Sequence, residues 1–282
     1  MVRYMNNIYV CSDIHGQYQL YKEMLEKINF SDNDTLYILG DMIDRGPESD
    51  KLMLDIINRP NIICCVGNHE VMMYSHEIGD YKNDFWCNSS NGGIETLTQF
   101  EKLTKEEQEK IKDYIFNKTY LQIEIEVNNK KYLLSHSGFV EGQGTIKNWK
   151  ELYKRNSSFW YSDVFDVVWR SPWRFGEYRS KESYNDGRIH IIGHVPVQAV
   201  RYDDDYQKAK WEKGHDLEVD EIEELCDKLE VWQNNSIINI DGGCAYLSKD
   251  VAFTNIGLIG LNLSESTLEN LKFTTHIGEK VK

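Results

Sequence analysis

Apolar and polar residues alternate in a regular order over the first 67 positions of the chain. Three short runs rich in β-branched and aromatic residues are separated by two segments in which leucine, isoleucine and methionine recur at helical spacing. Gly40 and Gly67 close the second and third runs. Strand, helix, strand, helix, strand is the order of an α/β fold with a parallel sheet. We therefore predict these elements at 7–12, 17–28, 35–39, 48–58 and 61–66.

The pattern changes after His69. Residues 70–117 have the composition and spacing of helices. Within them, Thr104 and Glu107 have the spacing of a capping box, in which each side chain accepts a hydrogen bond from the other residue's backbone amide. This segment is therefore expected to be a helical excursion from the sheet.

A hairpin and further strands are predicted in the second half of the chain. Residues 121–127 alternate apolar with polar positions, two asparagines provide a turn, and 131–135 return as a strand. Antiparallel pairing is therefore expected beside the parallel sheet. We predict the remaining strands at 189–192, 236–240 and 251–263.

In two other segments the apolar residues do not recur at a regular spacing. Residues 140–187 are rich in tryptophan, tyrosine, arginine and serine and are expected to form loops, whereas 203–230 are strongly acidic and are expected to form a surface insertion that ends in a helix. No linker separates these parts, so we expect one domain over residues 1–282.

Charge and cysteine usage narrow the function classes. The 46 acidic against 32 basic residues give a net charge of −14, which disfavours a general nucleic-acid binder or a binder of anionic membranes. No apolar run approaches the ~20 residues of a transmembrane helix, and the first twelve residues lack a signal-peptide pattern. The six cysteines are scattered, which favours free thiols in a reducing cytoplasm over disulfides or zinc.

Polar residues cluster directly after each of the three predicted parallel strands. The clusters read S-D-I-H-G from Ser12, G-D-M-I-D-R-G from Gly40 and G-N-H-E from Gly67. Loops at the carboxyl ends of parallel strands converge, so these side chains are expected in one place. His136 and His194 end later strands in the same way. An isolated histidine of this kind favours a structural role, but the repeated pattern favours a functional one.

Taken together, the motifs resemble those of calcineurin-like metallophosphoesterases, and specifically of serine/threonine phosphoprotein phosphatases. That pattern is G-D-x-H-G, G-D-x-x-D-R-G, G-N-H-E and two later histidines, and this chain has all five in order, the last two as S-H-S-G and G-H-V-P. Ser12 replaces the first glycine and removes no ligand. The resemblance extends from residue 8 to about 245. It implies an α/β fold, a four-layer α/β/β/α sandwich of two mixed sheets flanked by helices.

The resemblance implies a centre of two divalent metal ions, with Mn²⁺ favoured and Fe, Zn²⁺, Ni²⁺ and Mg²⁺ as alternatives. Carboxylate, amide and imidazole ligands suit such ions, and one carboxylate shared by both fits a two-metal site. The implied ligands of the first ion are Asp13, His15 and Asp41. The implied ligands of the second ion are Asp41, Asn68, His136 and His194.

The resemblance also assigns catalytic roles. A hydroxide that bridges the metals would attack phosphorus directly, and His69, oriented by Asp44, would donate a proton to the leaving oxygen.

Phosphate-binding residues follow from the same resemblance. Arg45 and Asn68 would contact the phosphate, the arginine as a fork. A second phosphate-binding arginine is expected after His136, where the alignment leaves Arg170 and Arg174 open with a slight preference for Arg170.

The resemblance implies a phosphomonoesterase that acts on phosphoserine or phosphothreonine in proteins. The main alternative is a symmetrical bis(5′-nucleosyl)-tetraphosphatase or another nucleotide phosphoesterase, which shares the motifs. A non-catalytic metal-binding scaffold is disfavoured because every motif residue is intact. The expected partners are a phosphorylated protein or a small phosphate ester or nucleotide, while the oligomeric state stays open.

Overall fold

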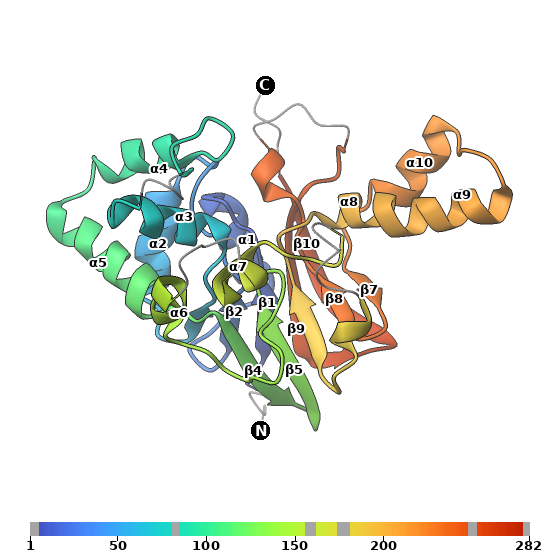
Figure 1. Ribbon diagram of the computed structural model, residues 1–282, viewed down its shortest axis with the longest axis horizontal. Coiled ribbons are helices and arrows are strands. Elements are labelled where there is room, and N and C mark those ends of the chain that lie inside the picture. Colours follow the sequence, from blue (N-terminus) through green and yellow to red (C-terminus); the bar gives the residue numbers. More distant parts are fainter. Residues whose placement is uncertain (1–5, 81–84, 156–161, 174–180, 248–252, 279–282) are drawn as a thin grey trace.

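The computed structural model describes residues 6–80, 85–155, 162–173, 181–247 and 253–278. Over these residues the chain forms two mixed five-stranded sheets that lie face to face and are flanked by helices (Figure 1). This arrangement confirms the predicted four-layer sandwich.

The first sheet has the strand order β10-β9-β1-β2-β3. β1, β2 and β3 are parallel, as predicted, and β9 pairs antiparallel with β1. The predicted last strand at 251–263 is wrong in its bounds, and β10 is an additional strand that completes a hairpin with β9. The strands are β1 (Ile8–Cys11), β2 (Thr35–Ile38), β3 (Ile62–Cys64), β9 (Gly257–Thr267) and β10 (Asn270–Ile277).

The second sheet has the strand order β4-β5-β6-β8-β7. The predicted hairpin is β4–β5, and β5, β6 and β8 run parallel. The short edge strand β7, which the hydrophobic pattern does not predict, pairs antiparallel with β8. The strands are β4 (Gln122–Val127), β5 (Lys130–Ser135), β6 (Ile189–Ile192), β7 (Trp232–Asn234) and β8 (Ile237–Asn239).

Two predicted helices connect the parallel strands of the first sheet, and the helical excursion leads from β3 to β4 of the second sheet. The capping box between Thr104 and Glu107 is present at the start of α5. The helices of this half are α1 (Tyr18–Lys27), α2 (Ser49–Ile57), α3 (Asn68–Glu77), α4 (Gly93–Phe100) and α5 (Lys105–Asn117). The aromatic-rich region contains α6 (Trp149–Arg155), α7 (Asp163–Val168) and the 3₁₀ turn Lys181–Tyr184.

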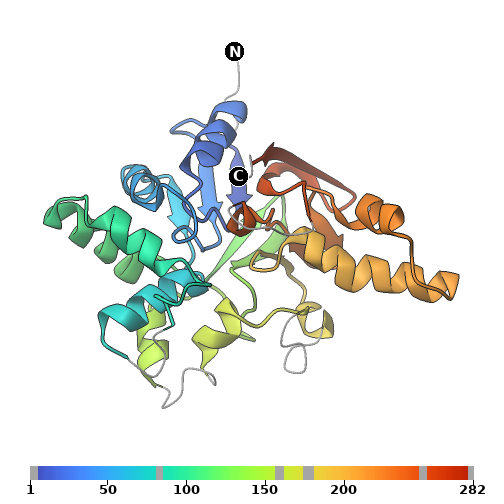
Figure 2. The same cartoon turned by 90° about the horizontal axis from the view of Figure 1, so that it is seen from above.

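The acidic segment forms a projecting arm, which we call the helical arm. It begins with α8 (Val197–Arg201), continues through a π-helical stretch (Tyr202–Tyr206) into α9 (Gln207–Lys213), and returns as α10 (Val219–Cys226). Figure 2 shows it extending away from both sheets. Val197 and Val200 of α8 are buried in the central core. Beyond α8, only a small cluster of Tyr206, Leu217 and Cys226 is buried within the arm, and Trp211 is 87% exposed.

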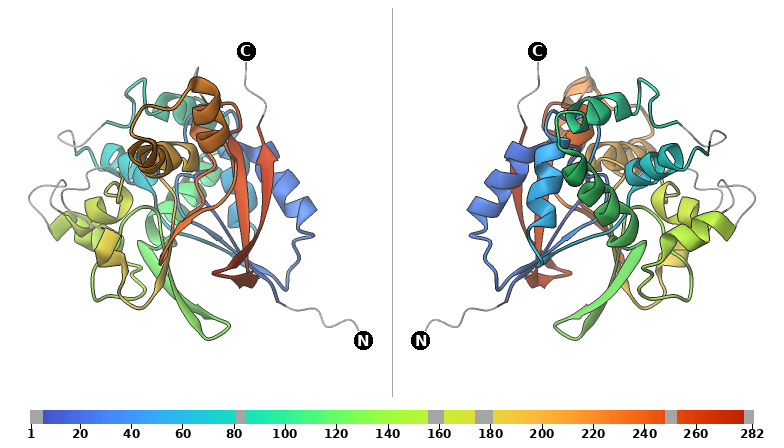
Figure 3. Two further views of the ribbon diagram at one scale, coloured as in Figure 1. Left: turned by 90° about the vertical axis from the view of Figure 1, so that its right-hand side faces the viewer. Right: turned by 90° about the vertical axis from the view of Figure 1, so that its left-hand side faces the viewer.

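The central core lies between the two sheets. Val10 and Leu261 of the first sheet and Leu133 and Ile191 of the second are fully buried in one cluster. A second cluster joins the other face of the first sheet to α1 and α2. The turn of the β4–β5 hairpin lies at the lower end of the sandwich in Figures 1 and 3. The carboxyl end of β5 therefore points to the opposite end.

All six cysteines lie in the described part of the chain and are free thiols, as predicted. Among the described residues, no helix has both the length and the apolar character needed to cross a bilayer.

Because Leu261 is fully buried between the sheets, truncating it should leave a cavity in the central core. We expect Leu261→Ala to lower the free energy of unfolding by about 2–5 kcal/mol, measured by urea denaturation. The matched control is Leu268→Ala, at an exposed position beyond β9, which should change stability by less than about 0.5 kcal/mol. Equal losses in the two variants would contradict the assigned core.

Candidate metal centre

The candidate residues follow the carboxyl ends of parallel strands from both sheets. Asp13 and His15 follow β1, and Asp41 follows β2. From the second sheet, His136 follows β5 and His194 follows β6. Backbone hydrogen bonds connect these loops, because the amides of Asp13 and His15 donate to the carbonyls of Gly40 (3.1 Å) and Asp41 (2.9 Å). Residues far apart in the sequence are thus brought to one edge.

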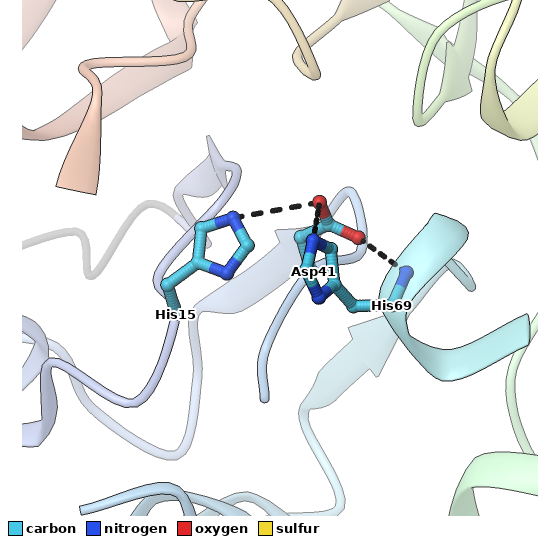
Figure 4. A group of neighbouring side chains, drawn as sticks. All are labelled: His15, Asp41 and His69. Atoms are coloured by element: carbon cyan, nitrogen blue, oxygen red, sulfur yellow. Dashed lines mark hydrogen bonds and ion pairs between the residues drawn. The ribbon is translucent and has the colours of Figure 1, made fainter. Parts of the chain in front are cut away.

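The Asp41 carboxylate lies at the middle of the site. Its Oδ2 atom is 3.5 Å from Nε2 of His15, 3.5 Å from Nε2 of His136 and 3.9 Å from Nε2 of His69. Figure 4 shows His15 and His69 directed at this oxygen from two sides. These distances exceed those of hydrogen bonds and match ligand atoms that share a cation. Asp41 therefore belongs to two groups of candidate ligands, one with His15 and His69 and one with His136 and His194.

The second group is the tighter one. The Asn68 Oδ1 atom lies 2.9 Å from His136 Nε2 and 3.1 Å from His194 Nδ1, and these two nitrogens are 3.2 Å apart. One amide oxygen and two imidazole nitrogens thus converge beside the Asp41 carboxylate. The four residues that the motif pattern assigns to one metal are together in space.

Backbone carbonyls fix the orientation of two of the rings. Nδ1 of His136 lies 2.8 Å from the Leu39 carbonyl, and Nδ1 of His15 lies 3.1 Å from the Ile43 carbonyl. A ring that donates from Nδ1 keeps the lone pair of Nε2 free for a cation. Burial lowers the pKa of His15 well below its usual value and that of His136 to about 4, so both rings are neutral.

Asp13 joins the site next to His194. Its Oδ2 atom accepts hydrogen bonds from the Ser12 hydroxyl and from the His194 amide (3.0 Å). Gly193 makes this approach possible, because a Cβ atom there would lie 2.1 Å from the same oxygen. Burial, followed by the nearby Asp241 carboxylate, raises the pKa of Asp13 well above its usual value.

Glu70 holds the Asp41 loop in place. Its carboxylate accepts from the amides of Gly67 (2.8 Å), Asp41 (2.9 Å), Met42 (2.8 Å) and, more weakly, Ile43 (3.3 Å). A side chain at the start of α3 therefore replaces the missing backbone partners of the loop after β2. Glu70 is the last residue of the G-N-H-E motif, but the motif alone does not reveal these contacts.

His69 and Asp44 form a fully buried pair. Nδ1 of His69 lies 2.7 Å from Asp44 Oδ2, so Nε2 faces the Asp41 carboxylate. Burial lowers the pKa of His69, and the neighbouring His15 and Arg45 act in the same direction. An ionised carboxylate hydrogen-bonded to Nδ1, as Asp44 is placed to provide, would favour the charged ring instead. An acid role would therefore depend on Asp44 and on the charge of an incoming phosphate.

Arg45 is placed beside this pair. Its guanidinium lies over the Tyr246 ring, 5.9 Å from the centroid, and its buried Nε atom has no hydrogen-bond partner among the described residues. Arg170 forms an ion pair with Asp166 (2.6 Å). Arg174 lies outside the described residues.

The donor set fits divalent cations. Asp13, Asp41, Asp44 and Glu70 are all buried at this edge, and burial raises the pKa of each. Glu70 and Asp44 are surrounded by donors, whereas the neighbours of Asp41 Oδ2 among the described residues are imidazole nitrogens. Neutral imidazoles and unneutralised carboxylates in one buried cluster are what a dication stabilises.

The backbone of the site is strained. Ten described residues other than glycine have a positive φ. Six of them belong to the predicted site: Asp13, His15, Asp41, Asp44, Arg45 and His194. The left-handed region is unfavourable for such residues and persists where surrounding contacts enforce it.

Two residues that no motif indicated complete the surroundings of Asp44. The indole of Trp86 and the hydroxyl of Thr96 both donate to its carboxylate, at 2.8 Å and 2.6 Å. Both belong to the helical excursion, in the part that follows α3, and no local pattern in the sequence connects them with Asp44.

Comparison with known proteins places the chain in a family. Residues 7–231 match the model of the calcineurin-like phosphoesterases. The serine/threonine-protein phosphatase 2 of Salmonella typhimurium is 35% identical over 141 residues, which cover 48% of this chain and 60% of that protein. A symmetrical bis(5′-nucleosyl)-tetraphosphatase of Buchnera aphidicola is 24% identical over 217 residues, or 69% of this chain and 74% of that protein.

Solved structures share the fold. A protein serine/threonine phosphatase from Saccharomyces cerevisiae has a TM-score of 0.54 at 17% identity, with coverage of 98% of this chain and 81% of that one. A cold-active protein tyrosine phosphatase has a TM-score of 0.52 at 14% identity, with coverage of 96% and 78%.

Because Gly193 leaves no room for a side chain beside Asp13, we expect Gly193→Ala to displace that carboxylate and to lower the divalent metal content of the purified protein. Elemental analysis measures the metal content, and circular dichroism checks the fold. Gly144→Ala is the matched control, since a Cβ there would meet nothing closer than 3.5 Å. Wild-type metal content in the Gly193 variant would contradict a ligand role for Asp13.

Proposed function

The chain belongs to the calcineurin-like phosphoesterase family, and from that premise we propose that it is a two-metal phosphomonoesterase that acts on phosphoserine or phosphothreonine in proteins. The observation that carries the proposal is the convergence of Asp41, Asn68, His136 and His194, with His15 and His69 on the other side of the shared carboxylate. Its donor atoms match a two-metal phosphoesterase site.

The chain provides ligands for two ions. Asp13, His15 and Asp41 would hold one, and the group around Asn68 would hold the other, with Mn²⁺ as the favoured metal. Oxygen and imidazole donors suit Mn²⁺, and no thiolate is required. When bound, the ions supply Lewis acidity toward phosphate oxygens and activate a water as the nucleophile.

The protein's own groups bind the phosphate and move the proton. Arg45 would bind two phosphate oxygens with its guanidinium fork, and Asn68 would lie beside the same group. Arg170 and Arg174 remain the two candidates for a second contact.

His69 would supply the proton that the leaving oxygen needs. As the attacking water forms its bond to phosphorus, the bond to the leaving oxygen breaks and that oxygen takes the proton from His69 Nε2. The proton released by the water then restores the imidazolium. Asp44 at Nδ1 keeps the ring in the required orientation.

A second candidate function has its own support. The symmetrical tetraphosphatase of Buchnera aphidicola matches over a larger share of this chain than the Salmonella phosphatase does. The alternative substrate is therefore a dinucleoside polyphosphate. The same metal centre would serve either substrate, so the difference lies in what surrounds the phosphate.

We further propose that residues 1–282 form a single phosphoesterase domain and that the protein acts in the cytoplasm. The buried core that both sheets share supports the first, and the six free cysteines support the second.

A comparison of two substrates tests this function. With Mn²⁺, we expect kcat/KM for a phosphoserine peptide to exceed that for diadenosine tetraphosphate by about tenfold or more. The opposite preference would establish the alternative. Failure to hydrolyse either substrate or p-nitrophenyl phosphate with any of several divalent ions would support a non-catalytic scaffold.

The assignment of His69 predicts a specific loss. We expect His69→Asn to lower kcat for a phosphoserine peptide about 10²-fold or more, because general acid catalysis contributes that much. The metal content should stay at the wild-type level. The control is His215→Asn, at an exposed position in the helical arm. Unchanged kcat would remove His69 from the acid role, and loss of metal would instead identify it as a ligand.

A further inference from the structure

The carboxylate of Asp44 is held by three donors at once. His69 Nδ1 and Trp86 Nε1 approach Oδ2 at 2.7 Å and 2.8 Å, and the Thr96 hydroxyl approaches Oδ1 at 2.6 Å. All four side chains are buried. The carboxylate therefore has one orientation in which every donor is satisfied, and rotation would leave buried polar groups unpaired.

Thr96 also holds the backbone of Asp44. Its hydroxyl oxygen accepts from the Asp44 amide at 3.0 Å, with the Ser49 hydroxyl oxygen at 3.2 Å from the same amide. Asp44 has a φ of 73°, in the left-handed region. Thr96 thus fixes both the side chain and the strained backbone of a residue 52 positions earlier in the chain.

Two glycines allow this segment to lie against the Asp44 turn. A Cβ atom at Gly92, which has a φ of 85°, would lie 2.5 Å from the Arg45 amide nitrogen. A Cβ atom at Gly93 would lie 2.7 Å from Cγ of Trp86. The segment from Trp86 to Thr96 therefore packs on the turn without space for side chains at these two positions.

We propose that Trp86 and Thr96 are positioning residues for phosphate ester cleavage: by fixing the Asp44 carboxylate, they hold His69 with Nε2 directed at the leaving oxygen. The inference rests on the proposed function, because it concerns the residue assigned there as the acid. Neither residue touches the substrate, and both act through Asp44.

The effect of a misdirected His69 on the rate depends on the leaving group of the ester. An ester of a basic alcohol needs a proton at the leaving oxygen, whereas p-nitrophenolate leaves readily without one. Phenol, with a pKa near that of tyrosine at about 10, is of the first kind. A misdirected His69 should therefore slow phenyl phosphate much more than p-nitrophenyl phosphate, whereas a general loss of folded protein slows both equally.

The experiment compares kcat and KM for these two substrates in the full-length Mn²⁺-loaded protein. The variants are Trp86→Phe, which removes the N–H, and Thr96→Val, which removes the hydroxyl at nearly constant volume. Thr96→Ser restores the hydroxyl. The matched controls are Trp149→Phe, a buried tryptophan that donates to Thr119, and Thr98→Val on the same helix α4.

We expect both variants to lower kcat for phenyl phosphate about tenfold more than for p-nitrophenyl phosphate, with KM for either substrate within about twofold of wild type. Thr96→Ser and the two controls should retain the wild-type ratio of the two kcat values. In a His69→Asn background, Trp86→Phe and Thr96→Val should cause no further change in that ratio.

Two outcomes separate this inference from the proposed function. If His69→Asn changes the ratio of kcat values and neither Trp86→Phe nor Thr96→Val does, the positioning role is wrong and the acid assignment stands. If His69→Asn leaves the ratio unchanged, the acid assignment itself fails, and the positioning role fails with it. Because Trp86 and Thr96 are tested separately, a variant that does not fold leaves the other to decide.

Discussion

The rest of the site depends on the burial of negative charge where the two sheets meet. Asp13, Asp41, Asp44 and Glu70 lie within one end of the sandwich and are almost completely buried. A buried carboxylate is unfavourable unless donors or cations surround it. The chain surrounds Glu70 with backbone amides and Asp44 with side-chain donors, but in the part of the chain that the structure describes it places imidazole nitrogens, not donors of this kind, around Asp41 Oδ2. Bound cations stabilise the charged form of such a carboxylate, whereas burial alone raises its pKa and favours the protonated form. The fold and the metal chemistry are therefore parts of one electrostatic problem.

The same constraint explains the strained backbone. Short loops must turn so that side chains from both sheets reach one point, and left-handed residues make such turns. Glu70 supports one of these loops through three of its amides and also holds the amide of Gly67. Gly193 and Gly67 give the space that carboxylates need, since a Cβ atom at either position would lie within 2.2 Å of an oxygen of Asp13 or Asp41. The contacts that hold the strained loops and the glycines that permit the close approaches thus lie around the same site carboxylates.

The hydrophobic pattern and the motifs predicted the sheet core and the residues at the strand ends, because each depends on a short stretch of sequence. The edge strands β7 and β10 were not predicted, since they are short or half-exposed and their polar residues obscure the alternation. Trp86 and Thr96 could not be predicted either. Their link to Asp44 spans 42 and 52 residues and exists only after α3 and α4 have packed.

Two groups among the 46 acidic residues behind the net charge of −14 differ in their physics. The buried carboxylates at the strand ends act at short range and attract cations, which in turn attract phosphate. The acidic residues of the helical arm lie at the surface, where several form ion pairs such as Lys210–Asp216 and Lys213–Glu221 and where salt screens them. α8 begins only three residues after His194, but α9 and α10 extend away from the sheets. An acidic protein can therefore bind an anionic ester, because the charge that the ester meets is set by the centre of the site and not by the total.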